Sequence, residues 1–226
     1  MIKPHGATEL KPLYVACAEQ RRSLESEAQR LPSLKISSAS AANAVMLGAG
    51  YFTPLSGFMD QRDMASVAAT MHTADGLFWP VPVVNLVQQC SYRTGDRIAL
   101  RDPNIEGNPV LAVQDVASVE QLSDKDLESA IQSIYGPLDR NHTGVNVFSP
   151  QGRVLVSGPI TVLNYSYFAQ VYPATFRTAE QIRADISDRG WSQVVAFQTR
   201  NPMHRAHEEL CKMAQAAVGA DGILIH

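Results

Sequence analysis

The segment that most constrains the fold of this chain lies near its carboxyl end. A run that ends in four apolar residues, Gln193–Phe197, is followed by the polar run 198–208 and later by a second apolar run, Gly222–Ile225. Between the two apolar runs, Pro202–Val218 has helical periodicity. Strand, helix and strand with a crossover of this length predict a right-handed βαβ unit with parallel strands. One such unit cannot bury both faces of its sheet, so we expect an incomplete α/β domain or one that relies on something outside this chain.

Polar and charged side chains are concentrated where the first of these strands passes into the helix. Arg200 lies in the connecting loop, where its guanidinium can form a fork of hydrogen bonds onto a tetrahedral anion. Gln198 and Asn201 add neutral donors, and His204 and His207 lie one turn apart at the start of the expected helix. The first N–H groups of a helix lack internal partners and the helix dipole is positive there. The sequence therefore predicts a clamp for an oxyanion and phosphates, with both imidazoles able to offset charge on a reacting phosphoryl group.

Two histidines on the flank of a helix also have other interpretations. In isolation such a pair is often only part of the polar surface. A binding site is favoured here because Arg200, Asn201, Pro202 and both histidines fall on one strand-to-helix junction. Zinc binding with Glu208 is disfavoured, because the order His-x-x-His-Glu is not His-Glu-x-x-His and no third ligand is nearby. We therefore expect no protein-bound metal. The periodicity of the helix also predicts a buried stripe, made of Met203, Ala206, Leu210, Ala214 and Ala217.

The preceding part of the sequence predicts an α+β domain with a mostly antiparallel, barrel-like sheet. A turn-rich stretch, 102–108, joins two of its strands as a hairpin, and Thr178 with Gln181 forms a capping box at the start of a later helix. Residues 1–13 are expected to form an arm on the body, and 165–176 a bridge to the second unit. The expected helices are 19–29, 37–47, 124–135 (ended by Gly136 and Pro137) and 178–189, and the expected strands are 81–87, 96–100, 110–116 and 153–156.

Composition excludes several classes of protein. With 45% hydrophobic and 18% charged residues the chain can bury a core, and its formal charge of −3 leaves no electrostatic footprint for nucleic acid or an anionic membrane. The three cysteines are widely spaced without a C-x-x-C pair, which argues against a disulfide framework or a zinc ribbon. No signal-like segment and no apolar stretch of about 18 residues occurs, so we expect a soluble cytoplasmic protein.

The polar run 198–208, Gln-Thr-Arg-Asn-Pro-Met-His-Arg-Ala-His-Glu, resembles a motif of the ATP sulfurylase (sulfate adenylyltransferase) family. This eleven-residue motif is highly specific for that family. Three earlier stretches are similar to the N-terminal domain of that family: Leu47–Met59, Gly95–Asp102 and Asp139–Val145. In the last of these the family usually has Pro where this chain has Thr143. We expect that departure to affect a turn rather than the chemistry.

The resemblance implies an N-terminal PUA-like β-barrel domain over residues 1–165 and a partial Rossmann-like nucleotidylyltransferase domain over residues 166–226. It implies the reaction of MgATP and sulfate to adenosine 5′-phosphosulfate and pyrophosphate, by in-line attack on the α-phosphorus without a covalent enzyme intermediate. Carried over by motif position, Gln198 and Arg200 hold sulfate, while Asn201, His204 and His207 contact the ATP phosphates. Mg²⁺ is then expected to enter with ATP, and the protein to form a homo-oligomer.

The chain also departs from the family in length, and two other functions stay open. The catalytic domain of the family continues beyond the position of His226 and includes a Gly-Arg-Asp-His-Ala motif that nothing here matches. We therefore expect a truncated or processed form with little activity in isolation. One alternative is a non-catalytic binding or assembly module that uses the PUA-like domain, and another is a nucleotidylyltransferase with an acceptor other than sulfate. The sequence does not decide the physiological direction of the reaction or the oligomeric state.

Overall fold

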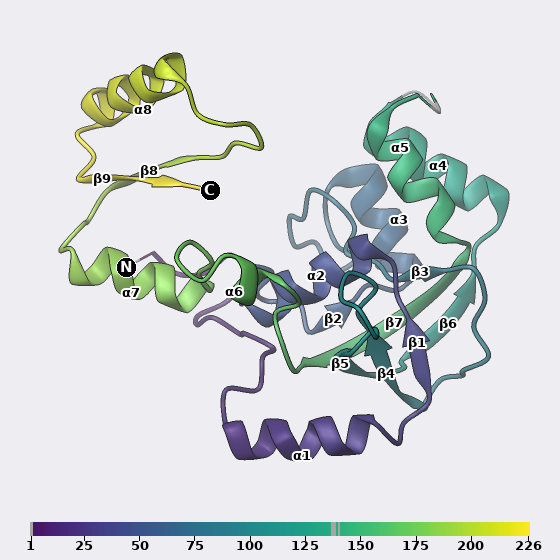
Figure 1. Cartoon of the computed structure of the whole chain (residues 1–226). Coiled ribbons are helices and arrows are strands. Elements are labelled where there is room, and N and C mark those ends of the chain that lie inside the picture. The colour runs from purple at the N-terminus through teal and green to yellow at the C-terminus, as the bar shows by residue number, and fades with distance from the viewer. Residues whose placement is uncertain (1, 137–138, 140) are drawn as a thin grey trace. The chain divides into compact units, whose positions relative to one another are not determined.

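The computed structural model of the chain describes residues 2–136, 139 and 141–226, and it divides the chain into two compact units. The first unit is Pro4–Phe176, and the second is Arg177–His226 together with the N-terminal end of the chain. Each unit has its own secondary structure (Figure 1). Two residues named above lie outside the described residues: Pro137, expected to end a helix, and Arg140 of the family-like stretch.

The first unit is built on a mixed sheet that forms a half-barrel around one long strand, β7. The strand order is β1-β4-β5-β7-β2, and β3 and β6 also pair with β7. β1 runs parallel to β4, and the other pairs are antiparallel. The strands are β1 (Ser33–Lys35), β2 (Gly57–Phe58), β3 (Leu86–Val87), β4 (Arg97–Arg101), β5 (Val110–Asp115), β6 (Ser118–Gln121) and β7 (Val154–Val162).

Two glycines allow the strands to approach β7 closely. A Cβ on Gly57 would lie 2.0 Å from the Gly158 carbonyl oxygen, and a Cβ on Gly158 would lie 2.2 Å from the Asp115 carbonyl oxygen. Gly158 also has φ of +133°, which residues with a side chain rarely adopt. Because of Gly158, β7 bends and continues through the Gly-Pro step to Val162, past the end at Val156 that the sequence predicts.

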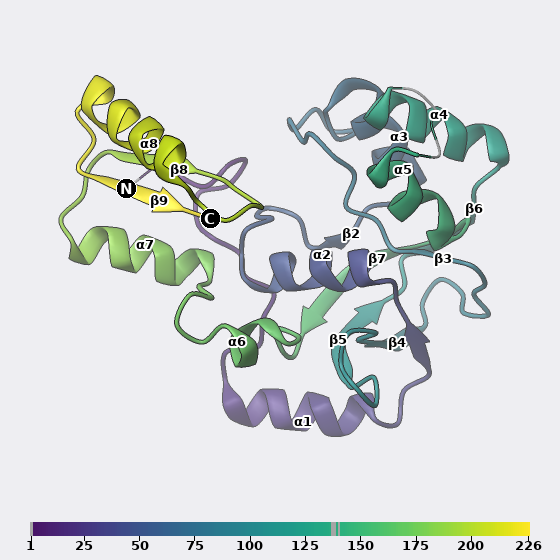
Figure 2. The same ribbon diagram turned by 45° about the horizontal axis from the view of Figure 1, so that its top comes forward.

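Helices cover the sheet, and several of them begin at a side-chain cap. Ser37 accepts a hydrogen bond from the Ser40 N–H at the start of α2, and Ser123 with Asp126 forms a capping box on α4. α3 and α4 pack against each other, and α5 lies beside α4 in both views (Figures 1 and 2). The helices of this unit are α1 (Ala18–Ala28), α2 (Ser38–Gly48), α3 (Gln61–Thr70), α4 (Asp124–Tyr135), α5 (Thr143–Phe148), η1 (Ser149–Gln151) and α6 (Phe168–Val171).

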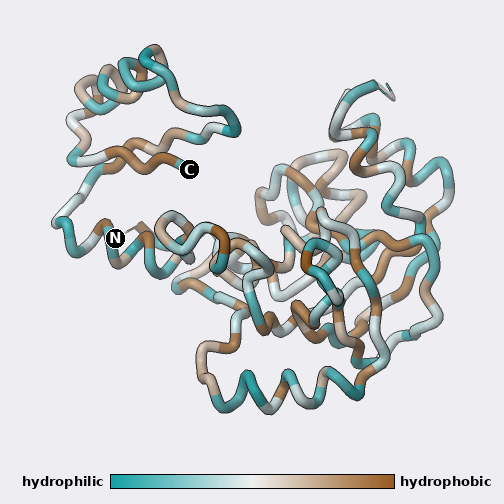
Figure 3. Tube along the Cα trace, viewed as in Figure 1, coloured by the Kyte–Doolittle hydropathy of each residue, from teal (hydrophilic) through white to brown (hydrophobic). Residues whose placement is uncertain are grey.

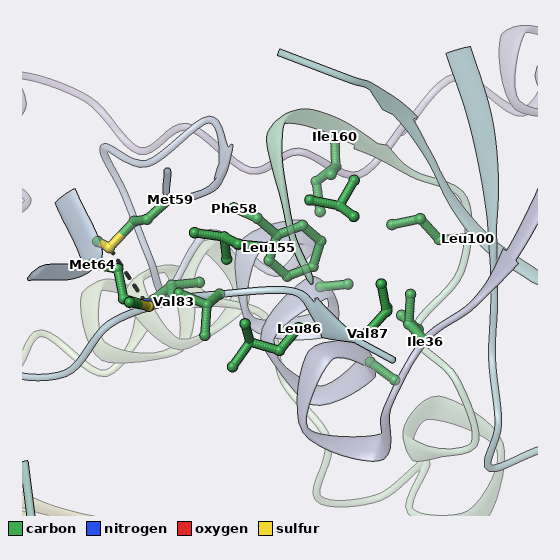
Figure 4. Close-up of a cluster of buried hydrophobic side chains, with 14 of the residues drawn as sticks. Ile36, Phe58, Met59, Met64, Val83, Leu86, Val87, Leu100, Leu155 and Ile160 are labelled. Atoms are coloured by element: carbon green, nitrogen blue, oxygen red, sulfur yellow. Dashed lines mark hydrogen bonds between the residues drawn. The ribbon is translucent and has the colours of Figure 1, made fainter. Parts of the chain in front are cut away.

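The core of the first unit lies between this sheet and the helices (Figure 4). Leu86, Leu100 and Leu155, from three different strands, have no exposed surface. Burying each such side chain contributes about 1.5–3 kcal/mol relative to leaving it exposed. At the edge of the cluster the Met59 sulfur accepts a hydrogen bond from the Val83 N–H at 3.4 Å. This contact holds the extended segment before β3, which does not pair with a strand there.

The second unit contains α7 (Ala179–Asp188), β8 (Val194–Phe197), α8 (Arg205–Val218) and β9 (Gly222–Ile225). β8 and β9 are parallel and in register from Val194–Gly222 to Phe197–Ile225, as the sequence predicts. α8 packs on both strands (Figure 2), and β9 is one of the most apolar segments of the trace (Figure 3). The capping box of Thr178 and Gln181 is present at α7, which confirms that prediction.

One carboxylate and one aromatic ring fix the beginnings of these two strands. Asp221, just before β9, accepts hydrogen bonds from the N–H groups of Ser192 and Gln193 just before β8, at 2.6 and 3.0 Å. Those backbone donors, Gln193 first, hold the pKa of Asp221 below its ordinary value. The ring of Trp191 lies directly over Gly222.

The structure corrects the sequence-based description of α8 in two respects. The helix begins at Arg205 instead of Pro202, because His204 has an extended backbone with φ of −130° and ψ of 174°. The expected buried stripe is wrong: Met203 is 38% exposed and Leu210 53% exposed, whereas Cys211 is buried. A sheet of two strands covers only a narrow face of a helix, and that face carries Cys211 and the half-buried His207.

Differences elsewhere reflect pairing between distant segments. Of the expected strand 81–87 only Leu86–Val87 pairs, because Pro80 and Pro82 lack the N–H group that a ladder needs. β1, β6, α3 and α5 have no counterpart among the sequence predictions. The expected helices 19–29, 37–47 and 124–135 and the β4–β5 hairpin are confirmed, with small shifts at their ends.

Candidate functional site

The candidate site lies in the second unit, where β8 ends and the chain turns into α8. The turn is fixed by the Thr199 hydroxyl, which donates to the Asn201 carbonyl at 3.0 Å and accepts the Asn201 N–H at 3.1 Å. The Thr199 N–H donates to the His226 carbonyl at 2.8 Å, so one end of the turn is attached to the strand ladder. Arg200 therefore lies exposed at the tip of a short turn whose backbone is fixed on both sides.

An open pocket of about 330 Å³ is lined by Gln198, Thr199 and Arg200. Its donors are an amide, a hydroxyl and a guanidinium, and the last of these suits a tetrahedral oxyanion because it offers parallel N–H groups. The sequence-based prediction placed Gln198 and Arg200 in one anion-binding loop. The structure brings both side chains to this one pocket.

The two predicted histidines meet at the start of α8, in different positions from those expected. His204 is the N-cap residue, and its carbonyl accepts the N–H groups of His207 and Glu208 at 2.9 and 3.2 Å. The ring centroids of His204 and His207 are 3.9 Å apart, and Phe197 of β8 lies 5.5 Å from the His207 ring. Both imidazoles thus lie at the positive end of a 14-residue helix, which favours a negatively charged ligand.

A reciprocal contact orients His207. Its Nδ1 accepts the N–H of His204 at 3.5 Å, a long bond. A ring held through Nδ1 leaves its Nε2 outside this contact. His207 can then contact a ligand through Nε2 while it keeps its contact with the backbone.

The acidic residues in the first turns of α8 are paired with a lysine. Lys212 donates to Glu208 at 2.6 Å and to Glu209 at 3.1 Å, and these bonds, that to Glu208 first, raise the pKa of Lys212. The two carboxylates are therefore engaged along the helix. For Asn201 the recorded contacts are those of its backbone with Thr199.

The described residues contain no group of three or more His, Cys, Asp or Glu side chains that could hold a metal ion. No helix among them is both long enough and apolar enough to cross a membrane. A second open groove, of about 490 Å³, lies in the first unit, and its polar lining is Lys35, Ser37 and three glutamines. Arg200, His204 and His207 are instead gathered at the β8–α8 junction.

One residue at this junction is absent from the sequence-based predictions. His226 follows β9, and its N–H donates to the Phe197 carbonyl at 3.0 Å. The signal that could have found it is the pairing of two parallel strands, because residues that follow such strands meet at the same edge of the sheet. The site residues predicted from the sequence all lie in the polar run 198–208, after the first strand.

Comparisons with known proteins agree with this division of the chain. The family model described as PUA-like domain matches residues 2–165, and the model described as ATP-sulfurylase matches residues 173–226. A protein named sulfate adenylyltransferase from Alcanivorax borkumensis is 59% identical over the whole chain, which covers 57% of that protein. Its namesake from Allochromatium vinosum is 57% identical with the same coverage.

A solved structure is also similar. The structure described as the hexameric APS kinase from Thiobacillus denitrificans has a TM-score of 0.76 and 27% sequence identity. The match covers all of this chain and 39% of that one. The chain spans about half the length of the curated relatives it matches.

Proposed function

The chain belongs to the ATP-sulfurylase family, and on that premise we propose that it takes part in adenylyl transfer between ATP and sulfate. The observation that carries the proposal is the meeting of Gln198, Arg200, His204 and His207 at one strand-to-helix junction. That junction lies inside the segment matched by the ATP-sulfurylase model. We propose that this segment, 166–226, is part of a Rossmann-like nucleotidylyltransferase domain and that 1–165 is a separate PUA-like domain.

In the proposed reaction a sulfate oxygen attacks the α-phosphorus of ATP in line. The bond from phosphorus to the bridging oxygen breaks, and pyrophosphate leaves with the electron pair. The Gln198 amide and the Arg200 guanidinium hold sulfate through charge-assisted hydrogen bonds. His204, His207 and Asn201 contact the phosphates and offset the charge that develops on them. Positioning and charge stabilisation account for such a reaction without a covalent intermediate.

Magnesium is proposed to arrive bound to ATP, as part of the substrate. The chemistry of the junction supports this assignment, because its donors are amide, guanidinium and imidazole groups, whereas Mg²⁺ prefers oxygen ligands. We likewise propose, from the resemblance to the family, that the protein forms a homo-oligomer and is located in the cytoplasm. The direction of the reaction stays open, since the same contacts serve sulfate activation and ATP recovery.

The proposal is tested by ATP formation from adenosine 5′-phosphosulfate and pyrophosphate, with calorimetric binding of adenosine 5′-phosphosulfate as a second readout. Arg200→Ala is expected to lower activity by about 10²–10³-fold, the usual loss for a donor to a developing charge. The matched control is Arg22→Ala in α1, which removes the same charge from the other unit and should change neither readout. If the folded wild-type chain neither forms ATP nor binds adenosine 5′-phosphosulfate saturably, the proposed function is wrong.

The alternative function is a binding or assembly module that uses the PUA-like domain. The match of that domain to residues 2–165 motivates it, whereas the net charge of −3 disfavours nucleic acid as the partner. Filter binding of RNA over a salt series separates the two functions. Binding that weakens steeply with salt and survives Arg200→Ala would favour the module.

A further inference from the structure

His226 is held beside Gln198 by two backbone hydrogen bonds. The His226 N–H donates to the Phe197 carbonyl at 3.0 Å, and the His226 carbonyl accepts the Thr199 N–H at 2.8 Å. These bonds lie on either side of Gln198, which is the pattern of a parallel ladder. The ladder of β8 and β9 therefore extends one residue past Phe197 and Ile225, and Gln198 and His226 become its next pair.

This pairing determines where the two side chains lie. Neighbours in register across parallel strands project from the same face of a sheet, and adjacent strands are about 4.8 Å apart. Gln198 and His226 therefore lie side by side. Successive side chains alternate in direction along a strand, so this face is opposite to that of Phe197, whose ring lies 5.5 Å from His207. The turn that carries Arg200 follows directly at the edge between the two faces.

The chemistry of this pair suits an oxyanion. Gln198 offers an amide N–H₂ group, His226 offers an imidazole N–H, and both residues are exposed to solvent. The nearby acids Glu208 and Glu209 are bound to Lys212 on α8, so their charge is offset along the helix. The proposed sulfate-binding Gln198 thus lies with His226 on one face of the strand ends, and the proposed phosphate-binding His207 lies on the other.

We propose that His226 is a further substrate-contacting residue, which together with Gln198 donates hydrogen bonds to the oxygens of sulfate. This inference rests on the proposed function, because it extends the same oxyanion site by one side chain. It assigns to the end of β9 a role that the sequence motif at 198–208 does not include. The backbone bonds of His226 position the ring, and the ring contacts the anion.

The test is an NMR titration of the ¹⁵N-labelled chain with sodium sulfate, at ionic strength held constant with sodium chloride. The readouts are the Gln198 side-chain amide, the His226 imidazole and the Arg200 guanidinium. His226→Ala is expected to lower the affinity for sulfate about five- to tenfold, because one hydrogen bond to a charged group is lost at an open site. His226→Asn keeps a donor and should recover most of that loss. The control His72→Ala removes an exposed histidine of the other unit and should have no effect.

The outcomes separate the inference from the function on which it rests. His226→Ala keeps both backbone bonds, and unchanged exchange of the Thr199 amide shows that the ladder is intact. If Arg200→Ala abolishes saturable binding while His226→Ala changes it by less than about twofold, the inference is wrong and the oxyanion site stands. If wild-type chain gives no saturable shift at Arg200 or Gln198, both the site and the inference are wrong.

Discussion

Gly222→Ala is expected to destabilise the β8–β9 pair through a single steric contact. An added Cβ would lie 2.3–2.4 Å from three ring atoms of Trp191, whereas carbon atoms in contact are about 3.5–4.0 Å apart. Gly222 is not among the glycines with positive φ, so alanine meets no backbone strain there. The ring must move by about 1–1.5 Å, and overpacking of this kind costs about 1–3 kcal/mol. The Arg189 guanidinium, 5.1 Å from the centre of the Trp191 ring, opposes that movement.

Native-state hydrogen exchange measures this cost at the site itself. The amides of Thr199 and His226 close the end of the ladder, with donor–acceptor distances of 2.8 and 3.0 Å. If local opening of the pair controls their exchange, a loss of about 1–3 kcal/mol speeds it about 5–150-fold. The second perturbation is Trp191→Leu, which replaces the ring by a shorter side chain and should reduce the cost of Gly222→Ala to less than about 0.5 kcal/mol.

Gly219→Ala is the matched control for this cycle. Gly219 has φ of +63° at the end of α8 and no neighbour within 4 Å of an added Cβ, so its cost of about 1 kcal/mol comes from the backbone alone. That cost should be the same whether residue 191 is Trp or Leu. Equal penalties for Gly222→Ala in the two backgrounds would refute the steric explanation, because they would show that the Trp191 ring is not what the new methyl group meets.

Three further predictions concern other parts of the chain. Thr199→Val keeps the shape of the side chain but removes both hydrogen bonds to Asn201, so sulfate affinity in the NMR titration should fall about three- to tenfold, whereas Thr199→Ser should retain it. Asp221 has a lowered pKa in the folded chain, so its stabilising effect is present above its ordinary pKa of 3.8 and is lost as pH falls through the lower folded value. The protection of the Gln193 amide, which is its exchange rate relative to that of the unfolded chain at the same pH, should therefore fall in acid, and in Asp221→Asn this fall should be missing. Leu155→Ala should lower the free energy of unfolding of the first unit by about 2–5 kcal/mol, measured by urea unfolding, without a change in the slope of that free energy against urea concentration. A loss below about 1 kcal/mol would show that the neighbouring strands move into the space left by the side chain.

Local signals in the sequence were sufficient for most of the helices that the sequence predicts. The helix over 124–135 and the capping box of Thr178 follow from periodicity and from hydrogen bonds within one turn. The start of α8 was misplaced because Pro202 suits a first helical turn, while the extended backbone of His204 depends on its contact with His207. That contact does not follow from periodicity.

Several elements were not predicted because their partners are distant in sequence. β1 is three residues long and exists because β4 pairs with it, and β6 exists because β7 does. The predicted site residues are brought to one junction because strand, loop and helix are consecutive in the chain. His226 was missed because its neighbour Gln198 is adjacent only across the strand pair.

The position of β7 has a consequence for the order in which the first unit can form. This strand pairs with β2, β3, β5 and β6, and its partner Gly57 precedes Pro159 by about a hundred residues. Contacts of such long sequence separation require a large loop to close before they contribute, which slows folding. During synthesis the earlier strands lack their common partner until residue 162 has left the ribosome. The half-barrel therefore completes late, and β2, which is made early and pairs with β7, keeps an unpaired edge until then.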